Sequence, residues 1–208
     1  MQNDQAQFIK MTETPVHKLI TSLAIPTIII MLVTAIYNIA DTFFVAKLGT
    51  SASGAVGIVF SLMAIIQAIG FTLGMGSGSL ISRLLGAKKN EKANEMASTG
   101  FFTAIIFGVL LALFGIINLD ALMKALGSSD SILPLAKNYA KYILIAAPVM
   151  CASFVLNNIL RSEGKARFAM VGIASGSIIN IFLDPILIFK FDMGISGAAI
   201  ATMVSQMI

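Results

Sequence analysis

The charged residues of this chain are gathered into short clusters separated by long apolar stretches. Uncharged runs cover 19–40, 48–82, 96–119, 142–160 and 193–208, and the run 168–189 is interrupted only by Asp184. A helix needs about 20 apolar residues to cross a bilayer. The run 48–82 opens with the turn-like segment 49–54, so its helix is expected from about residue 55. The pattern predicts an all-α integral membrane protein with six transmembrane helices, at about 19–46, 55–82, 96–119, 137–160, 168–189 and 194–208, the last truncated.

Two other fold classes fail on composition and periodicity. Charged residues make up 12% of the chain, whereas soluble domains carry about 25%, so a water-soluble surface is excluded. A transmembrane barrel needs strands of alternating polarity, and the run Ile25-Pro-Thr-Ile-Ile-Ile-Met-Leu-Val shows no such alternation. The single Cys151 lies in an apolar run, so no disulfide forms within one chain.

Residues 1–18 and the basic residues predict the orientation. The first 18 residues carry several charges and lack the apolar core of a secretory leader, so they are expected to be a cytoplasmic lead-in. With the N-terminus inside, nine basic residues lie in the cytoplasm, against five outside. Every Arg is then inside, which the positive-inside rule favours. The net charge is +4, and the basic residues lie in short loops at the ends of the spans. They therefore indicate the topology and contact with membrane lipid, not nucleic-acid binding. The inner set is Lys10, Lys18, Arg83, Lys88, Lys89, Lys92, Arg161, Lys165 and Arg167, and the outer set is Lys47, Lys124, Lys137, Lys141 and Lys190.

An internal repeat relates the only two acids within the predicted spans. Asp41 is followed by Lys47 and by Ser-Gly-Ala at 53–55, and Asp184 is followed at the same intervals by Lys190 and by Ser-Gly-Ala at 196–198. Both copies end one predicted helix and open the next, so the repeat is parallel. At 1.5 Å per residue, each Asp lies about 9 Å below its Lys. We therefore expect both carboxylates at a similar depth in the outward half of the membrane.

Such acids are costly in lipid and indicate an inward-facing site. An ionised Asp at a helix centre costs about 2.5–3.5 kcal/mol on insertion scales. Two carboxylates in one cavity repel when both are ionised, which favours capture of a proton or a metal cation. The alternative is structural, with each acid capping a neighbouring helix or pairing with a loop Lys.

Polar residues at helical spacing strengthen the site hypothesis. Asn180 precedes Asp184 by four residues, and Ala198 and Thr202 form a similar pair. Amide, hydroxyl and carbonyl oxygens suit Na⁺ or a hydrogen-bonded protonated acid. Each polar residue taken singly is as well explained by a bond between helices. Further neighbours that complete the predicted cluster are Tyr37 and Asn38 beside Asp41, and Tyr139 and Asn157 from the fourth predicted helix.

Prolines and glycines mark where the spans deform or pack closely. Pro185 directly follows Asp184, Pro26 lies near the start of the first span, and Pro148 lies in the fourth. Each removes a backbone donor, so each is either a static kink or a hinge, and we consider Pro26 and Pro185 the candidate hinges. Gly70 and Gly74 form a GxxxG pair that is expected to let two helices approach closely.

Several segments resemble the multidrug and toxic compound extrusion (MATE) family. They are the first span with Pro26 and Asp41, the stretch from Gly74 through Arg83-Leu-Leu-Gly86-Ala-Lys, the loop Leu160-Arg-Ser-Glu-Gly164-Lys, and Asn180-Ile-Phe-Leu-Asp184-Pro. The resemblance implies a twelve-helix secondary transporter of two six-helix lobes, not an enzyme, in the cell (inner) membrane. It implies export of small organic, cationic compounds driven by inward H⁺ or Na⁺, with no other cofactor.

The same resemblance assigns the site residues and the missing part. It maps the family's N-lobe cation site, and a Na⁺ ion if sodium is used, onto Asp41, Asn180, Asp184 and Thr202. The Ala198 carbonyl is a further ligand, and Tyr37, Tyr139 and Asn157 line the site. This chain matches one lobe, 19–208, so the second lobe is an expected partner. Two alternatives are a lipid-linked oligosaccharide flippase, which needs basic groups in its cleft, and an intramembrane aspartyl protease, whose motifs are absent around Asp41 and Asp184.

The predicted orientation can be tested by single-cysteine labelling in a Cys151→Ala background. We expect cysteines placed near Lys89 and Lys165 to be protected from an impermeant reagent in intact cells. Cysteines near Ser51, Ser129 and Asp192 should react, because the positive-inside rule places those loops outside. External labelling near Lys89 would overturn the orientation.

Overall fold

The computed structural model describes residue 9 and residues 13–207, so most of the predicted lead-in 1–18 lies outside the described residues. Within the described part every regular element is helical. The elements, in chain order, are α2 (Val16–Ala46), α3 (Thr50–Gly86), α4 (Asn90–Ile117), α5 (Leu119–Ala125), α6 (Leu133–Ser162), α7 (Ala166–Pro185), the π-helix η1 (Ile186–Lys190) and α8 (Gly194–Gln206).

Five of these segments are long and apolar enough to cross a membrane. They are α2, α3, α4, α6 and the continuous segment of α7 with η1. The sixth predicted segment forms α8, which has 13 residues and is shorter than a span. The expectation of an all-helical, multi-pass membrane protein is confirmed, and α5 is a short helix that the charge pattern did not predict.

The start of α3 corrects the interpretation of the segment 49–54 as a loop. The helix begins at Thr50, so the turn consists of Lys47, Leu48 and Gly49, the last with φ at 113°. Ala52 and Ala55 are buried in the helix, and Gly54 faces the side chain of Ile132. Small residues that look like turn formers in sequence therefore serve here as a close-packing helix face, because tertiary contact outweighs their weak local preference.

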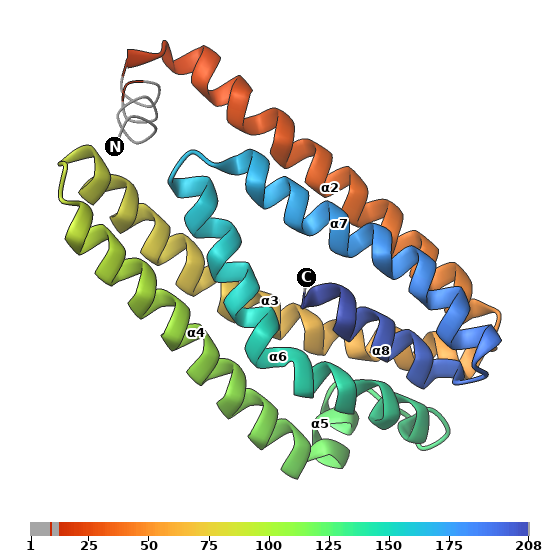
Figure 1. Cartoon of the computed structure of the whole chain (residues 1–208). Helices are drawn as coiled ribbons and strands as arrows, with labels where there is room; N and C mark the ends of the chain where they lie inside the picture. Colours follow the sequence, from red (N-terminus) through yellow and green to blue (C-terminus); the bar gives the residue numbers. More distant parts are fainter. Residues whose placement is uncertain (1–8, 10–12, 208) are drawn as a thin grey trace.

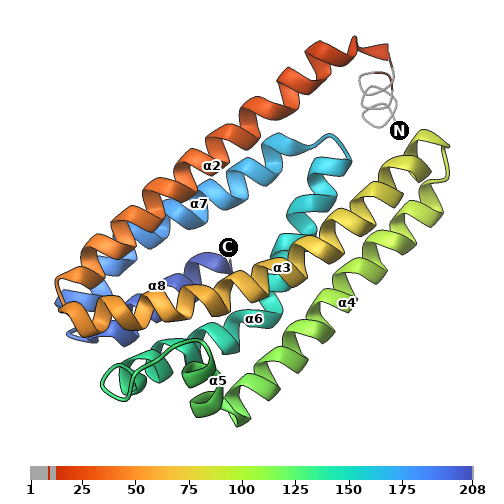
Figure 2. The ribbon, with the colours of Figure 1, turned by 180° about the vertical axis from the view of Figure 1, so that it is seen from behind.

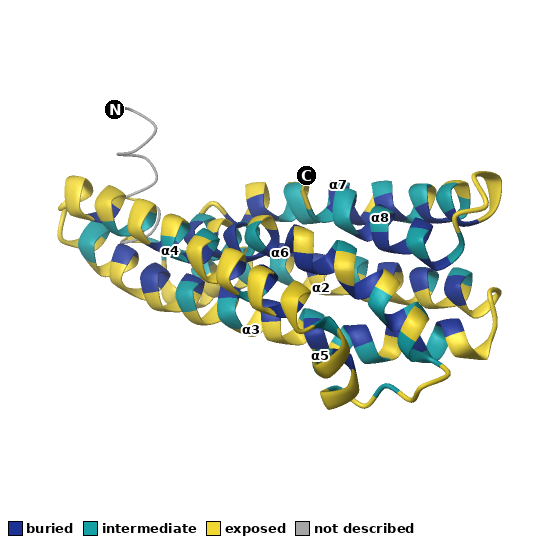
Figure 3. Ribbon diagram, turned by 90° about the horizontal axis from the view of Figure 1, so that it is seen from below, coloured by how far each residue is buried: buried dark blue, intermediate teal, exposed yellow. Residues whose placement is uncertain are grey.

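The helices form two groups that meet at α8 (Figures 1 and 2). The helices α3, α4 and α6 pack together, α2 packs along α7, and α8 lies between α6 and α7. Buried residues follow the facing sides of the helices, and exposed residues follow the outer sides (Figure 3). In the most apolar 18-residue stretch of each helix, 50% of the α6 residues are buried, against 11% of the α2 residues. The helix α6 is therefore central and α2 peripheral.

Connections cluster at opposite ends of the lobe. The α3–α4 and α6–α7 loops lie at the same end as the start of α2 (Figure 1). The α2–α3 and α7–α8 connections and α5 lie at the other end, and α2 and α7 run side by side in the same direction (Figures 1 and 2). The parallel arrangement expected of the two repeat copies is therefore present.

Close contact between α3 and α6 depends on glycine. A Cβ on Gly70 would lie 2.6 Å from Cβ of Phe154, and one on Gly74 would lie 2.9 Å from Cβ of Asn158. Both are closer than Cβ atoms approach in folded proteins, so the GxxxG expectation is confirmed. On the other side of α6, a Cβ on Gly108 of α4 would lie 2.5 Å from Cα of Pro148.

Pro26 and Pro185 affect their helices differently. The helix α2 continues through Pro26, which is buried on the same face as Asp41. At Pro185, by contrast, α7 gives way to the π-helix η1. A missing proline N–H interrupts the i→i−4 ladder, and π turns often occur at functional sites.

Gly54 and Gly197 occupy matching repeat positions but differ in their surroundings. A Cβ on Gly197 would lie 2.7 Å from the backbone carbon of Leu187, whereas one on Gly54 would meet the tip of Ile132 at 3.0 Å. We expect Gly197→Ala to cost about 1–3 kcal/mol and lower the melting temperature, because backbone cannot move aside as a side chain can. Gly54→Ala should have little effect.

Thermal unfolding of the purified chain in detergent, followed by circular dichroism, measures both variants. Equal losses in the two would show that the close approach of α8 to η1 is not what stabilises this corner.

Candidate functional site

The two acids of the repeat come together between α2 and α7. Asp41 is 1% exposed and Asp184 is fully buried. Their carboxyl groups lie within hydrogen-bonding reach of one another. Two ionised carboxylates this close repel one another, so the arrangement favours a shared proton or a bound cation.

Each carboxyl group also keeps one oxygen without a partner. Oδ1 of Asp41 and Oδ1 of Asp184 are buried and accept no hydrogen bond from the described residues. An unpaired buried acceptor costs about 1–3 kcal/mol, and more when charged. The site therefore offers free acceptor oxygens in a protein interior.

Asn180 connects the acid pair to α8. The hydrogen-bond network orients its amide so that the nitrogen donates to Oδ2 of Asp184 at 2.9 Å. In this orientation the amide oxygen accepts from the backbone N–H of Thr202 at 3.2 Å. Asn180 is fully buried one turn before Asp184. Its amide therefore fixes the position of one carboxylate.

Two tyrosines meet the hydroxyl of Thr202. The hydroxyl groups of Tyr139 and Thr202 are 3.2 Å apart. The Tyr37 hydroxyl lies within hydrogen-bonding reach of the side chains of Thr202 and Gln206. Ala198 is fully buried one turn before Thr202 in α8. The structure thus gathers Tyr37, Tyr139, Ala198 and Thr202 around the acid pair.

Two predicted neighbours lie outside this cluster. Asn157 is half-buried, and its amide nitrogen donates to the Ser153 carbonyl of its own helix at 3.0 Å. Asn38 is exposed on α2, and its carbonyl accepts a bond from the Thr42 hydroxyl at 2.8 Å. Its side chain is therefore on the outside of the lobe, contrary to the expectation that it joins Asp41.

Gln206 was not predicted as a site residue. This residue follows Thr202 by four positions, as Thr202 follows Ala198, so all three share one face of α8. The spacing was visible in the sequence. It was overlooked because Gln206 lies beside neither acid in the chain.

Aromatic rings pack together where α2 and η1 end, near the α2–α3 connection. The Lys47 ammonium lies 4.5 Å from the ring centre of Phe43 and 5.9 Å from that of Phe189. The rings of Phe44 and Phe189 are 6.4 Å apart, edge to face. These contacts join the end of α2 to η1.

The chain is a helical membrane lobe with a buried acid pair between parallel repeat helices. These features place it in the class of multi-pass transport proteins. The family model described as MatE matches residues 26–186. This chain belongs to the MatE family, the MATE transporters, which are secondary transporters and not enzymes.

Relatives over the whole chain are exporters by name. The chain is 32% identical over 207 residues to the multidrug export protein MepA of Staphylococcus aureus (strain MRSA252), covering 99% of this chain and 46% of MepA. It is 31% identical to MepA of Staphylococcus saprophyticus, covering 46% of that protein. The chain thus spans about half the length of these relatives.

Solved structures agree with this assignment. An outward-facing multidrug resistance MATE family transporter of the MOP superfamily superposes with a TM-score of 0.89 at 36% identity, covering 96% of this chain and 44% of that one. A MATE crystal structure in the bent conformation gives 0.88 at 36% identity, with 96% and 44% covered. The coverage is that of one lobe of a two-lobed transporter.

Proposed function

We propose that this chain is one lobe of a cation-driven multidrug exporter and that Asp41 and Asp184 form its coupling site. The observation that carries the proposal is the burial of two facing carboxyl groups, each with an unpartnered oxygen, in a membrane lobe. Such acids are retained in membrane proteins chiefly for proton or ion traffic. The names of the MepA relatives support drug export as the output.

The donor set favours a proton or Na⁺. Two carboxylates are accompanied by the Asn180 amide, the Thr202 hydroxyl and the Ala198 carbonyl, all of which are hard oxygen ligands. Among the described residues no three of His, Cys, Asp and Glu come together. Soft-ligand transition metals therefore have no matching site in the described part.

Coupling requires that cation binding favour one conformation of the lobe. The helix α2 carries Asp41, packs along α7, which carries Asp184, and is the least buried span. Related MATE structures are described as straight and bent. We assign Pro26 and Pro185 as the points where α2 and the end of α7 deform when the site changes its charge.

The complete transporter includes a second lobe of six helices. The chain covers 46% of MepA, and the drug cleft lies between the lobes in this proposal. Its substrates are small organic cations, exported across the cell (inner) membrane in which the N-terminus is cytoplasmic. In this proposal Asn157 belongs to the outer part of the polar network that supports the site.

The efflux prediction uses Asp41→Asn and Asp184→Asn in a two-lobed transporter that carries this lobe. Asn keeps the volume and the hydrogen bonding of Asp but cannot ionise, so packing should survive. We expect membrane levels and melting temperature to hold or rise, because a buried charge is removed. Efflux of a cationic dye should fall to background in both variants. Asn180→Ala should reduce it less, since a water can replace one neutral ligand.

The alternative in which the acids only cap helices predicts a different outcome, because Asn caps about as well as Asp. Retained cation-driven efflux in the Asp41→Asn, Asp184→Asn double variant, at normal membrane levels, is the result that contradicts the coupling site.

The identity of the ion can be measured on the purified chain, which contains all the proposed ligands. If Na⁺ is the ligand, its addition at about 100 times the dissociation constant stabilises the fold by about 2.7 kcal/mol. The melting temperature should then rise with NaCl but not with choline chloride, and Thr202→Val should reduce the rise. Absence of any Na⁺-specific shift, with efflux still dependent on the acids, assigns coupling to the proton.

A further inference from the structure

One face of α6 carries polar side chains from the acid site toward the opposite end of the lobe. Ser153, Asn157 and Arg161 follow one another at intervals of four residues, which places them on adjacent turns of the same face. The first touches the site's border, because the Ser153 hydroxyl donates to the Gln206 carbonyl at 3.5 Å. Eight residues of helix carry this face over about 12 Å.

Two buried polar atoms on this face have no partner. Oδ1 of Asn157 and Nε of Arg161 make no hydrogen bond with the described residues. Buried polar groups in folded proteins are nearly always paired with protein or with ordered water. An acceptor and a donor left unpaired on successive turns mark places where water molecules can bind. Together they indicate that the face is hydrated.

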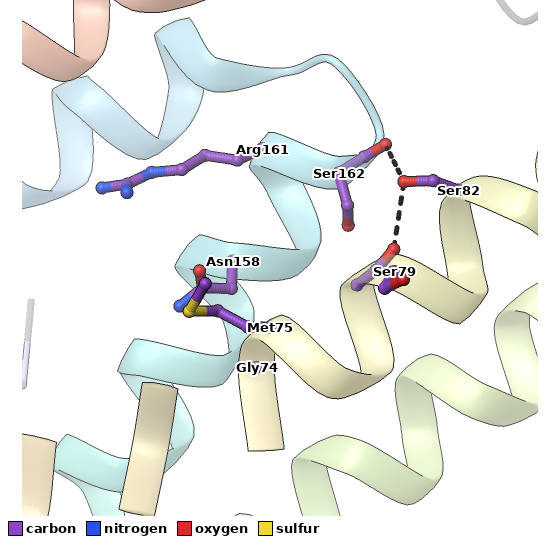
Figure 4. A pocket seen from close by; sticks show the side chains of 8 residues that line it. Gly74, Met75, Ser79, Ser82, Asn158, Arg161 and Ser162 are labelled. Carbon is purple, nitrogen blue, oxygen red and sulfur yellow. Dashed lines mark hydrogen bonds between the residues drawn. The ribbon is translucent and has the colours of Figure 1, made fainter. Parts of the chain in front are cut away.

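Arg161 borders an open, shallow pocket at the end of α6. The pocket, of about 350 Å³, lies between α3 and α6 and is bordered by Asn158, Ser79, Ser82 and Ser162 as well as Arg161. In Figure 4 the Arg161 side chain extends from α6 away from these serines. A water molecule takes up about 30 Å³ of liquid, so this volume can hold several. The pocket is at the end of the lobe that carries the α3–α4 and α6–α7 loops.

The charge of Arg161 determines which ions can approach this end of α6. Arg161 forms no ion pair within the described part of the chain, and the nearby Lys165 is paired with Glu163 at 2.8 Å. A guanidinium is always ionised. A fixed positive charge beside a hydrated face repels cations and attracts anions.

We propose that the Ser153–Asn157–Arg161 face is a water-accessible track from the acid site to this end of the lobe, and that Arg161 is an electrostatic barrier to cations at its mouth. The track hydrates the site from one side, while the barrier prevents a cation at the acid pair from leaking along it. Only this last consequence rests on the proposed coupling site. The track and the barrier themselves are properties of α6.

Thiol reactivity tests the track. In a Cys151→Ala background, Asn157→Cys is compared with Leu156→Cys, whose parent side chain is 44% exposed on another face at nearly the same depth. Methanethiosulfonates react with thiolates, which form in water and not in lipid. We expect the anionic sulfonatoethyl reagent to modify Asn157→Cys at least about tenfold faster than Leu156→Cys. Equal rates at the two positions would refute a hydrated track.

The barrier is tested by the charge of the reagent. With Arg161 present, the anionic reagent should modify Asn157→Cys about three to ten times faster than the cationic trimethylammonium reagent, because a charge one turn away attracts one and repels the other. Arg161→Gln should remove this preference and Arg161→Lys should keep it. A preference unchanged in Arg161→Gln would overturn the barrier.

Ser153→Cys provides a second, nearly isosteric site if Asn157→Cys folds poorly, and the same ratios apply to it. These labelling results do not depend on efflux. Loss of the track with intact dependence on Asp41, or the reverse, therefore distinguishes failure of this inference from failure of the proposed function.

Discussion

The lobe depends on close approach of helices, because lipid gives them no hydrophobic reason to associate. The closest contacts are made where a side chain is absent. Gly70 admits Phe154, Gly108 admits Pro148, and Gly197 admits the backbone of η1. Each contact fixes the distance between two helices, and together they make α6 the central element. Everything that surrounds the acid pair is positioned by this packing.

The acid pair is what the packing makes available. The repeat gives α2 and α7 the same direction and places one acid on each at a similar depth. Burial on adjacent helices brings the two carboxyl groups together, where two ionised carboxylates would repel. Asn180 and Thr202 link this pair to α8, so a change of charge at the pair is felt by three helices. The proposed coupling of an ion to a conformational change rests on this link.

The repeat is asymmetric where it borders the site. The first copy ends at Lys47 and turns at Gly49, whereas the second copy passes through Pro185 into a π-helix. The helix α2 is also held mainly by α7, while α6 is surrounded. The lobe thus combines a firmly packed group of α3, α4 and α6 with a peripheral helix that carries one of the two acids. Of the spans, α2 is the least buried, so its motion relative to that group disrupts the least buried contact.

The sequence by itself determined the helical membrane class, the repeat and the two acids, because charge clustering, helical length and spacing are local properties of the chain. It did not predict α5, and the sixth predicted span is the 13-residue α8. Asp41, Asn180, Asp184 and Thr202 were all found from the sequence. The segment 49–54 was wrongly predicted as a loop, and Asn38 was wrongly predicted to face Asp41. Gln206 was not predicted at all. Those outcomes depend on which face of each helix meets a neighbour. Only the tertiary structure decided that, since the glycine contacts set the rotation and the distance of the helices.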